Sequence, residues 1–176
     1  ETQIIGQVRD AYAAAREAGA TGRVFNRLFQ QALAVAKRVH STTSLGEKNV
    51  SIPSVAARLA ERIFQDLSRR NVVVLGAGEM GELAVHAFRT RGAVKLHVVN
   101  RTMDHARELA AKFGGEAHPL EDLARVLPLG DIVIACLRSD TYALSVEQVR
   151  QALAARGGEP MFLIDIAVPR NIHPEV

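Results

Sequence analysis

The stretch "VVVLGAGEMG", residues 72–81, constrains the fold more than any other part of the sequence. Its opening run is apolar and rich in β-branched residues, which is typical of a strand buried on both faces of a parallel sheet. The glycines that follow match the pattern G-x-G-x-x-G, which is weak evidence alone but gains weight between a buried strand and a helix. There, Gly76 permits a tight turn, Gly78 lets a pyrophosphate approach the backbone, and Gly81 lets the helix pack on the strand. The expected phosphate loop comprises Gly76, Ala77, Gly78, Glu79, Met80 and Gly81.

Apolar strand-like runs alternate with helical segments through the rest of the chain. We expect strands at 72–76, 95–100, 116–118, 131–136 and 161–168, and helices at 79–91, 102–114, 120–127 and 145–157. Such alternation is typical of βαβ units and of a parallel sheet. The sequence therefore predicts an α/β fold, with a Rossmann-type doubly wound parallel sheet in the order 3-2-1-4-5 preceded by a helical segment.

The first third of the chain has apolar residues at helical spacing. We expect helices at 6–19, 25–40 and 54–67, with a loop rich in Ser and Thr between the second and the third. The expected parts are a helical segment at 1–45, a connecting loop and helix at 46–70, and the nucleotide-binding Rossmann domain at 71–176. The chain starts with Glu1 and its last stretch, "NIHPEV", ends without a closing element, so we expect a piece of a longer protein.

The composition limits which kinds of binding partner and which cellular compartment are expected for this chain. The net charge of +3 permits an anionic partner but does not demand nucleic acid. Cys136 is the single cysteine, so no internal disulfide is possible, and we expect a reducing, cytoplasmic compartment. No apolar run approaches the roughly 20 residues that cross a bilayer, so no membrane partner is expected. The six histidines show no metal-ligand spacing, so we expect no metal.

Basic residues of the helical segment form a further candidate surface. They could contact RNA phosphates, but their scatter and the lack of interleaved aromatic residues favour ordinary exposed helix faces. These residues are Arg23, Arg27, Lys37, Arg38, His40, Arg58 and Arg62.

The end of the second expected strand indicates the cofactor. In NAD-binding domains an acidic residue about 20 positions after the glycines accepts hydrogen bonds from the ribose 2′-hydroxyl. Here the strand ends in Asn100-Arg101-Thr102. Arg101 would pair with a 2′-phosphate, Asn100 and Thr102 can donate further hydrogen bonds, and Thr102 also suits the N-cap of the next helix. This pattern predicts NADPH, the alternative being an ordinary surface arginine beside a turn that binds nothing.

Further segments narrow the family. The glycine loop and "VVNRT" fit several NADP-dependent reductases, shikimate dehydrogenase among them. In addition "ETQIIGQV", "NRLFQQALAVAKRVHSTTSLG", "VSIPSVA", "GAGEMGELA" and "FLIDIAVPRNIHPEV" occur in this order. With these segments, which cover nearly the whole chain, the sequence resembles glutamyl-tRNA reductase.

The resemblance implies an activity and a domain organisation. Enzymes of this family reduce glutamyl-tRNA(Glu) to glutamate-1-semialdehyde with NADPH in tetrapyrrole (heme and chlorophyll) biosynthesis. They consist of an N-terminal catalytic domain, an NADPH domain and a C-terminal helical domain that forms a homodimer. Residues 1–45 would then be the end of the catalytic domain, and the dimerisation domain would be absent from this chain.

The resemblance also implies site residues. Glu1, Thr2, Gln3 and Gln7 would line the pocket for the glutamyl group, although a solvated helix surface is the simpler interpretation of their spacing. Ala167 and Val168 would contact the cofactor after the last strand, the alternative being a simple strand exit. The family's nucleophilic cysteine lies in a segment before Glu1, so no catalytic residue is expected here. Cys136, which ends a buried strand, is interpreted as structural, and the isolated chain is expected to be inactive.

One departure from the family pattern keeps other functions open. Small residues commonly follow the fourth strand, whereas here the stretch "CLRSD", Cys136 to Asp140, places Leu137 and Arg138 there. Their bulk could alter how the nicotinamide sits. A non-catalytic nucleotide-binding regulatory module is therefore one alternative. A shikimate dehydrogenase-like reductase is another, but it needs a catalytic Lys–Asp pair, for which none of the lysines has a suitable setting.

Overall fold

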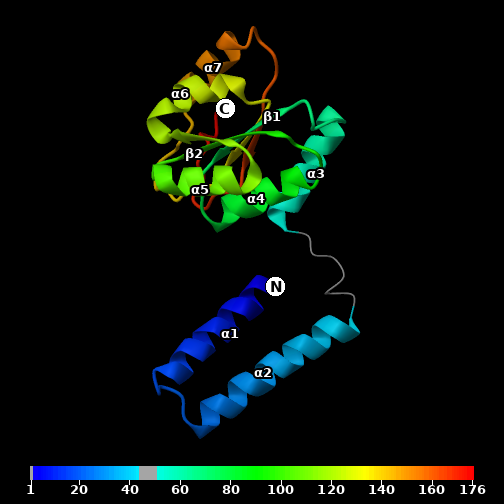
Figure 1. The fold of residues 1–176 in the computed structure, drawn as a ribbon, viewed down its shortest axis with the longest axis vertical. Coiled ribbons are helices and arrows are strands. Elements are labelled where there is room, and N and C mark those ends of the chain that lie inside the picture. Colours follow the sequence, from blue (N-terminus) through cyan, green and yellow to red (C-terminus); the bar gives the residue numbers. More distant parts are fainter. Residues whose placement is uncertain (1, 44–50) are drawn as a thin grey trace. The chain divides into compact units, whose positions relative to one another are not determined.

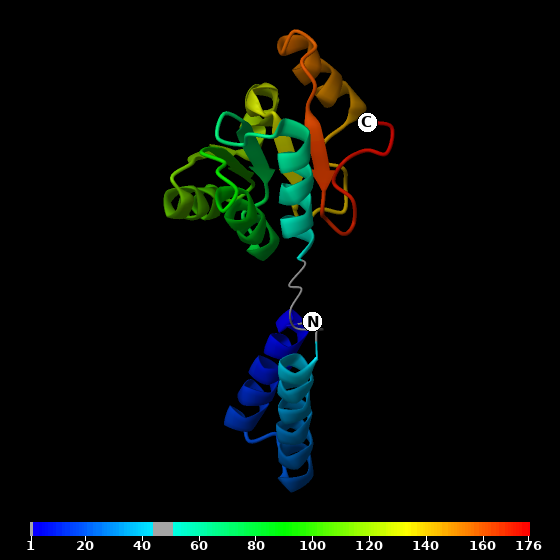
Figure 2. The same cartoon turned by 90° about the vertical axis from the view of Figure 1, so that its right-hand side faces the viewer.

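The computed structural model of the chain describes residues 2–43 and 51–176. The chain divides into two compact units, with the boundary between Asn49 and Val50. The first unit contains two helices and the second contains a sheet with helices on both faces (Figures 1 and 2).

The first unit is a helical hairpin made by α1 (Thr2–Glu17) and α2 (Arg23–Thr42). Both helices begin earlier than the sequence predicts, and α2 also ends later. The Tyr12 hydroxyl donates a hydrogen bond to Asn26 Oδ1 at 3.1 Å, and its ring stacks on Phe29 at 5.2 Å. No residue of α2 is buried. The apolar side chains that α2 leaves exposed are Val24, Phe25, Leu28, Val35 and Val39.

The second unit is built on a parallel sheet. Its strands are β1 (Asn71–Leu75), β2 (Lys95–Asn100), β3 (Glu116–Pro119), β4 (Ile132–Ala135) and β5 (Phe162–Asp165). They lie in the order β3-β2-β1-β4-β5, which confirms the predicted fold class and strand order. The strands follow the expected apolar runs because β-branched residues pack well on a sheet covered on both faces. Successive strands are added outward in opposite directions from β1 and from β4, so the crevice for a ligand opens at the carboxyl ends of these two strands.

Helices cover both faces of this sheet (Figure 1). On one face lie α3 (Ile52–Phe64), α4 (Glu79–Arg89) and α5 (Met103–Phe113), which share a core cluster with Val72, Val74 and Val98. On the other lie α6 (Leu123–Val126) and α7 (Val146–Ala155), packed around Val73, Val133 and other buried residues. None of the described helices is both long enough and apolar enough to span a membrane.

Helix α3 is part of this second core. Ala57 and Ala60 are fully buried in the cluster that contains Phe88 of α4. The helix starts where Ser51 Oγ accepts a hydrogen bond from the Ser54 amide, with Pro53 in the first turn. The sequence predicts this helix within a connecting segment, whereas its buried alanines make it a structural element of the sheet domain.

The segment 120–127 differs from the single helix that the sequence predicts. It forms a 3₁₀ turn at Leu120–Asp122, the short helix α6, and a second 3₁₀ turn at Leu127–Leu129. Pro128 has no N–H to continue an α-helical ladder, and its ring disfavours helical geometry before it. The prediction places helical structure correctly in this segment, but the segment is not one regular α-helix.

Candidate functional site

The glycine loop follows β1 at the carboxyl edge of the sheet. Gly76 has φ of +117°, and its amide donates to the Val99 carbonyl of β2 at 2.8 Å. A Cβ at Gly76 would lie 2.8 Å from the carbonyl oxygen of Cys136, and a Cβ at Gly81 would overlap the carbonyl oxygen of Gly76. Both positions therefore require glycine because of contacts within the protein itself.

Gly78 differs from the other two glycines. It is the N-cap residue of α4, with extended backbone, and a Cβ built there meets nothing within 4 Å among the residues that the structure describes. Protein packing does not explain this glycine, but close approach of a ligand to the backbone would. The first amides of α4 point outward beside it, where an anion meets unpaired N–H groups and the positive end of the helix dipole. This cradle fits a pyrophosphate.

Two acidic side chains flank that cradle. Glu79 and Glu82 both lie in the first turn of α4. Glu82 forms an ion pair with Lys112 of α5, which offsets its charge. Glu79 also has an interaction partner within the protein.

Asn100 connects the glycine loop to the end of β2. Its Oδ1 accepts a hydrogen bond from the Ala77 amide at 3.3 Å, and its Nδ2 donates to the Thr102 carbonyl at 3.0 Å. One of its two amide hydrogens is thus already used within the protein. The main role of Asn100 is therefore to position the loop, and it has only one hydrogen left to donate to a ligand. This positioning role is not visible in the sequence, because it depends on two segments 23 residues apart.

Arg101 and Thr102 extend into solvent beyond this bridge. Both are exposed. Within the described part of the chain, the Arg101 guanidinium has no hydrogen-bond or ion-pair partner. Thr102 occupies the N-cap position of α5 as expected, but its hydroxyl makes no capping bond. The cation expected for a 2′-phosphate therefore lies uncommitted at the end of β2, next to a free hydroxyl.

The ends of β4 and β5 form the other side of the crevice. Asn171 is fully buried, and its Oδ1 accepts a hydrogen bond from the Leu137 amide at 2.7 Å. Its Nδ2 is buried with no partner among the described residues. The Leu137 side chain packs in the core with Leu144, so its bulk lies inside the protein, while Arg138 is exposed. Of the two unusual residues in "CLRSD", only Arg138 can meet a ligand.

Asp165 shapes the loop after β5. Its carboxylate accepts hydrogen bonds from the amides of Ala167 at 3.0 Å, Asn171 at 2.8 Å and Ile172 at 2.9 Å. Ala167 is half-buried and Val168 is 97% exposed, so the two residues expected to contact the cofactor differ in how accessible they are to a ligand. Sequence reasoning missed Asp165 and Asn171, although both lie in the segment "DIAVPRN" that carries the family resemblance.

Cys136 has the environment of a structural thiol. Its Sγ lies 3.2 Å from the Leu75 carbonyl oxygen and 3.5 Å from that of Gly76. Burial, with a contribution from the nearby Asp165 carboxylate, raises the pKa of the Cys136 thiol to about 12. Because only the thiolate is nucleophilic, Cys136 is inert at neutral pH.

The residues expected to contact a glutamyl group lie at the start of the first unit. Thr2, Gln3 and Gln7 all belong to α1. Gln7 is exposed. Glu1 lies outside the described residues.

The sequence matches two family models. Residues 1–43 match the N-terminal domain of glutamyl-tRNAGlu reductase, and residues 58–176 match shikimate / quinate 5-dehydrogenase. With the sheet order, the second match makes residues 58–176 a nucleotide-binding domain of the NAD(P)-dependent dehydrogenase type.

Individual relatives extend over the whole chain. The glutamyl-tRNA reductases of Priestia megaterium and Rubrobacter xylanophilus are 46% and 49% identical over 176 residues, which is 100% of this chain. The structure of glutamyl-tRNA reductase from Methanopyrus kandleri is 36% identical, with a TM-score of 0.67, and is matched by 99% of this chain over 44% of its own. The chain spans about two fifths of the length of the curated relatives, 40% and 41%.

Proposed function

Since the chain belongs to the glutamyl-tRNA reductase family, and residues 58–176 to the shikimate / quinate 5-dehydrogenase family of domains, we propose that it is the NADPH-binding part of a glutamyl-tRNA reductase. The whole enzyme would reduce glutamyl-tRNA(Glu) to glutamate-1-semialdehyde for tetrapyrrole biosynthesis. It would act in the cytoplasm as a homodimer joined through a C-terminal domain.

The observation that carries this proposal is the pairing of an open glycine cradle with a free arginine. Gly78 leaves open space beside the amino end of α4, which suits a pyrophosphate. Arg101 lies at the end of the adjacent strand with its guanidinium uncommitted among the described residues. A bidentate arginine pair recognises a 2′-phosphate, which NADPH has and NADH lacks.

The remaining site residues would hold and orient the cofactor. Asn100 would keep the glycine loop against β2, and the Thr102 hydroxyl would donate to the phosphate that Arg101 binds. The half-buried Ala167 and exposed Val168 would border the nicotinamide, which supplies the hydride when bound. The buried Nδ2 of Asn171, which has no partner among the described residues, is a polar group near Leu137 that a carboxamide could satisfy.

The chain by itself would bind cofactor without catalysing the reaction. In the whole enzyme a cysteine upstream of Glu1 would take the glutamyl group from the tRNA as a thioester, and Glu1, Thr2, Gln3 and Gln7 would contact that group. Cys136 does not suit this role, because burial keeps its thiol protonated. The burial of Leu137 also weakens the alternative of a non-catalytic module, since that residue leaves the crevice unobstructed.

A titration of the chain with NADPH and with NADH tests the cofactor assignment. We expect NADPH to bind more tightly, and Arg101→Ala to remove about 1.5–3 kcal/mol of its binding free energy, the contribution of a hydrogen bond to a charged group. NADH binding should be nearly unchanged. Isothermal titration calorimetry or nicotinamide fluorescence measures both affinities.

Arg150→Ala is the matched control, because Arg150 is an exposed arginine on α7. It should leave both affinities unchanged. Equal binding of the two nucleotides by the unmodified chain, or an equal loss for both in Arg101→Ala, would contradict a 2′-phosphate role for Arg101.

A further inference from the structure

Two histidines from neighbouring strands face each other away from the glycine loop. His97 lies in β2 and His118 in β3. The strands are paired with His97 opposite Glu116 and Val99 opposite His118, so the three polar side chains project from the same face of the sheet. His97 Nδ1 lies 3.1 Å from His118 Nε2. Both residues are buried, with 8% and 7% of their surface exposed.

The Glu116 carboxylate completes a triangle of ligand atoms. The same oxygen, Oε2, lies 3.6 Å from His97 Nδ1 and 3.8 Å from His118 Nε2. Ligand atoms about 2.0–2.2 Å from a tetrahedral zinc ion are roughly 3.3 Å from one another. The observed separations scatter around this value, so one ion near the centre of the triangle would reach all three ligands after small rotations of the side chains.

A simple hydrogen bond between the two rings explains less of this arrangement. It needs only one nitrogen of each ring, and it gives the carboxylate no reason to face the same two nitrogens.

The cluster has access to solvent at the amino ends of the strands. A surface hollow there is lined by His97 and Glu116 together with Asn71, Lys95, Gly115 and Leu129. It gives an ion a path to the buried nitrogens and leaves room for water as a fourth ligand. Lys95 also lines this hollow. The glycine loop lies at the opposite, carboxyl edge of the sheet, so the cluster is separate from the cofactor site.

We propose that His97, His118 and Glu116 bind one divalent transition-metal ion of the zinc class, with water completing the coordination. Two imidazoles and one carboxylate suit Zn²⁺ and exclude a preference for Mg²⁺. The ion ties β3, the four-residue strand at the edge of the sheet, to β2. This site is a structural clamp on the nucleotide-binding domain.

Calorimetric titration of the untagged, metal-free chain with Zn²⁺ and with Mg²⁺ tests the proposal. We expect one Zn²⁺ per chain and no Mg²⁺ binding, with Co²⁺ giving the visible absorption of a tetrahedral site. His118→Asn and Glu116→Gln should each weaken Zn²⁺ binding by about tenfold or more, since each removes a ligand. The thermal midpoint should rise with Zn²⁺ in the unmodified chain but not in His118→Asn.

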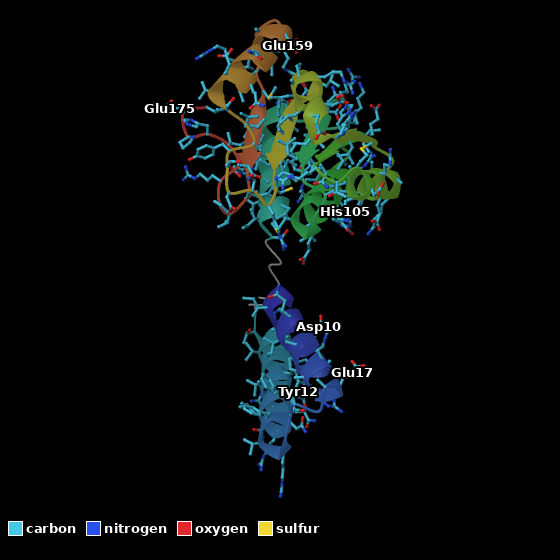
Figure 3. The ribbon with its side chains drawn as sticks, turned by 90° about the vertical axis from the view of Figure 1, so that its left-hand side faces the viewer. Asp10, Tyr12, Glu17, His105, Glu159 and Glu175 are labelled. Carbon is cyan, nitrogen blue, oxygen red and sulfur yellow. The ribbon has the colours of Figure 1, made fainter. Side chains whose placement is uncertain are left out.

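His105→Asn is the matched control, because His105 is an exposed histidine on α5 (Figure 3). It should bind Zn²⁺ like the unmodified chain. If His118→Asn fails to fold, Glu116→Gln decides, since the Glu116 side chain is 72% exposed. Absence of stoichiometric Zn²⁺ binding, or unchanged affinity in both ligand variants, overturns the proposal.

Discussion

The three glycines of the loop after β1 are required for two different reasons. Neighbouring backbone atoms require glycine at positions 76 and 81, whereas no atom of residues 2–43 or 51–176 requires it at Gly78. The G-x-G-x-x-G pattern predicts all three glycines, but it does not distinguish those that the neighbouring backbone requires from the one that a ligand would require. For Asn100, the sequence predicts the position of the residue but not its role. Its position is predicted from the strand end, while its bond to the Ala77 amide depends on a contact that no local pattern contains.

Cys136 provides a test at the same scale. Its pKa is raised from 9.0 to about 12, which corresponds to roughly 1000-fold less thiolate at a given pH. We expect alkylation by iodoacetamide at pH 8 to be at least roughly 100-fold slower in the native chain than in urea, where the thiol is exposed. Mass spectrometry of quenched samples measures the two rates. Similar rates would show that the native thiol is accessible and would reopen a chemical role for it.

Whole elements were predicted best where the pattern is strongest. β1 and β4 are wholly apolar runs, and the order of the sheet follows from the alternation of strands and helices. The segment 120–127 was predicted less well, because Pro128 interrupts a regular hydrophobic pattern. The His97–His118 pair could not be predicted at all. Its members are 21 residues apart and meet only through the register of β2 and β3.

Asp131 joins three elements and gives a prediction for pH. Its carboxylate accepts hydrogen bonds from the Asn71 amide at 2.9 Å and from Arg156 Nη2 at 2.8 Å. Burial by itself raises the pKa of Asp131, but these hydrogen bonds and the Arg156 charge outweigh it, so the pKa is lowered. A carboxyl with a lowered pKa stabilises the fold above its unfolded pKa of about 3.9, and this contribution is lost as pH falls further.

Asp131→Asn should therefore lower the free energy of unfolding at pH 7 by about 1.5–3 kcal/mol, the contribution of hydrogen bonds to a charged group. The difference from the unmodified chain should shrink as the pH falls below about 4. Urea unfolding followed by circular dichroism at several pH values measures this. Asp104→Asn, at an exposed ion pair on α5, should change little. A difference between Asp131→Asn and the unmodified chain that does not vary with pH would exclude the charge of Asp131 as the cause.

At the scale of the whole molecule, the chain consists of two units with very different cores. The helical hairpin buries Tyr12 and leaves the apolar residues of α2 exposed, whereas the sheet domain has a buried cluster on each face. The helix α3 lies after the boundary and packs with the sheet domain. The sequence predicts the Rossmann domain at 71–176 and this helix within a connecting segment, because the apolar spacing of α3 alone does not reveal which core it joins.

Shortening the chain tests this division. Residues 50–176 should fold alone and bind NADPH within about twofold of the full chain, because both cores and the glycine loop are retained. Residues 66–176, which lack α3, should lose at least about 2 kcal/mol of unfolding free energy, since Ala57 and Ala60 no longer cover the first core. Denaturant unfolding and NADPH titration of both pieces provide the measurements. Equal stability of the two pieces would mean that α3 contributes nothing to the sheet domain.

Because the hydrogen bond between Asn100 and Ala77 holds the glycine loop, the structure of the loop and the choice of coenzyme depend on different residues and can change independently in evolution. Asn100 faces inward and maintains the loop, whereas Arg101, its neighbour in sequence, faces outward and meets only the ligand in our proposal. A lineage could therefore exchange one nicotinamide coenzyme for the other by a single codon change at position 101, without passing through a form whose loop has collapsed. Variation at position 101 combined with constancy at position 100 is the signature that such drift would leave among descendants.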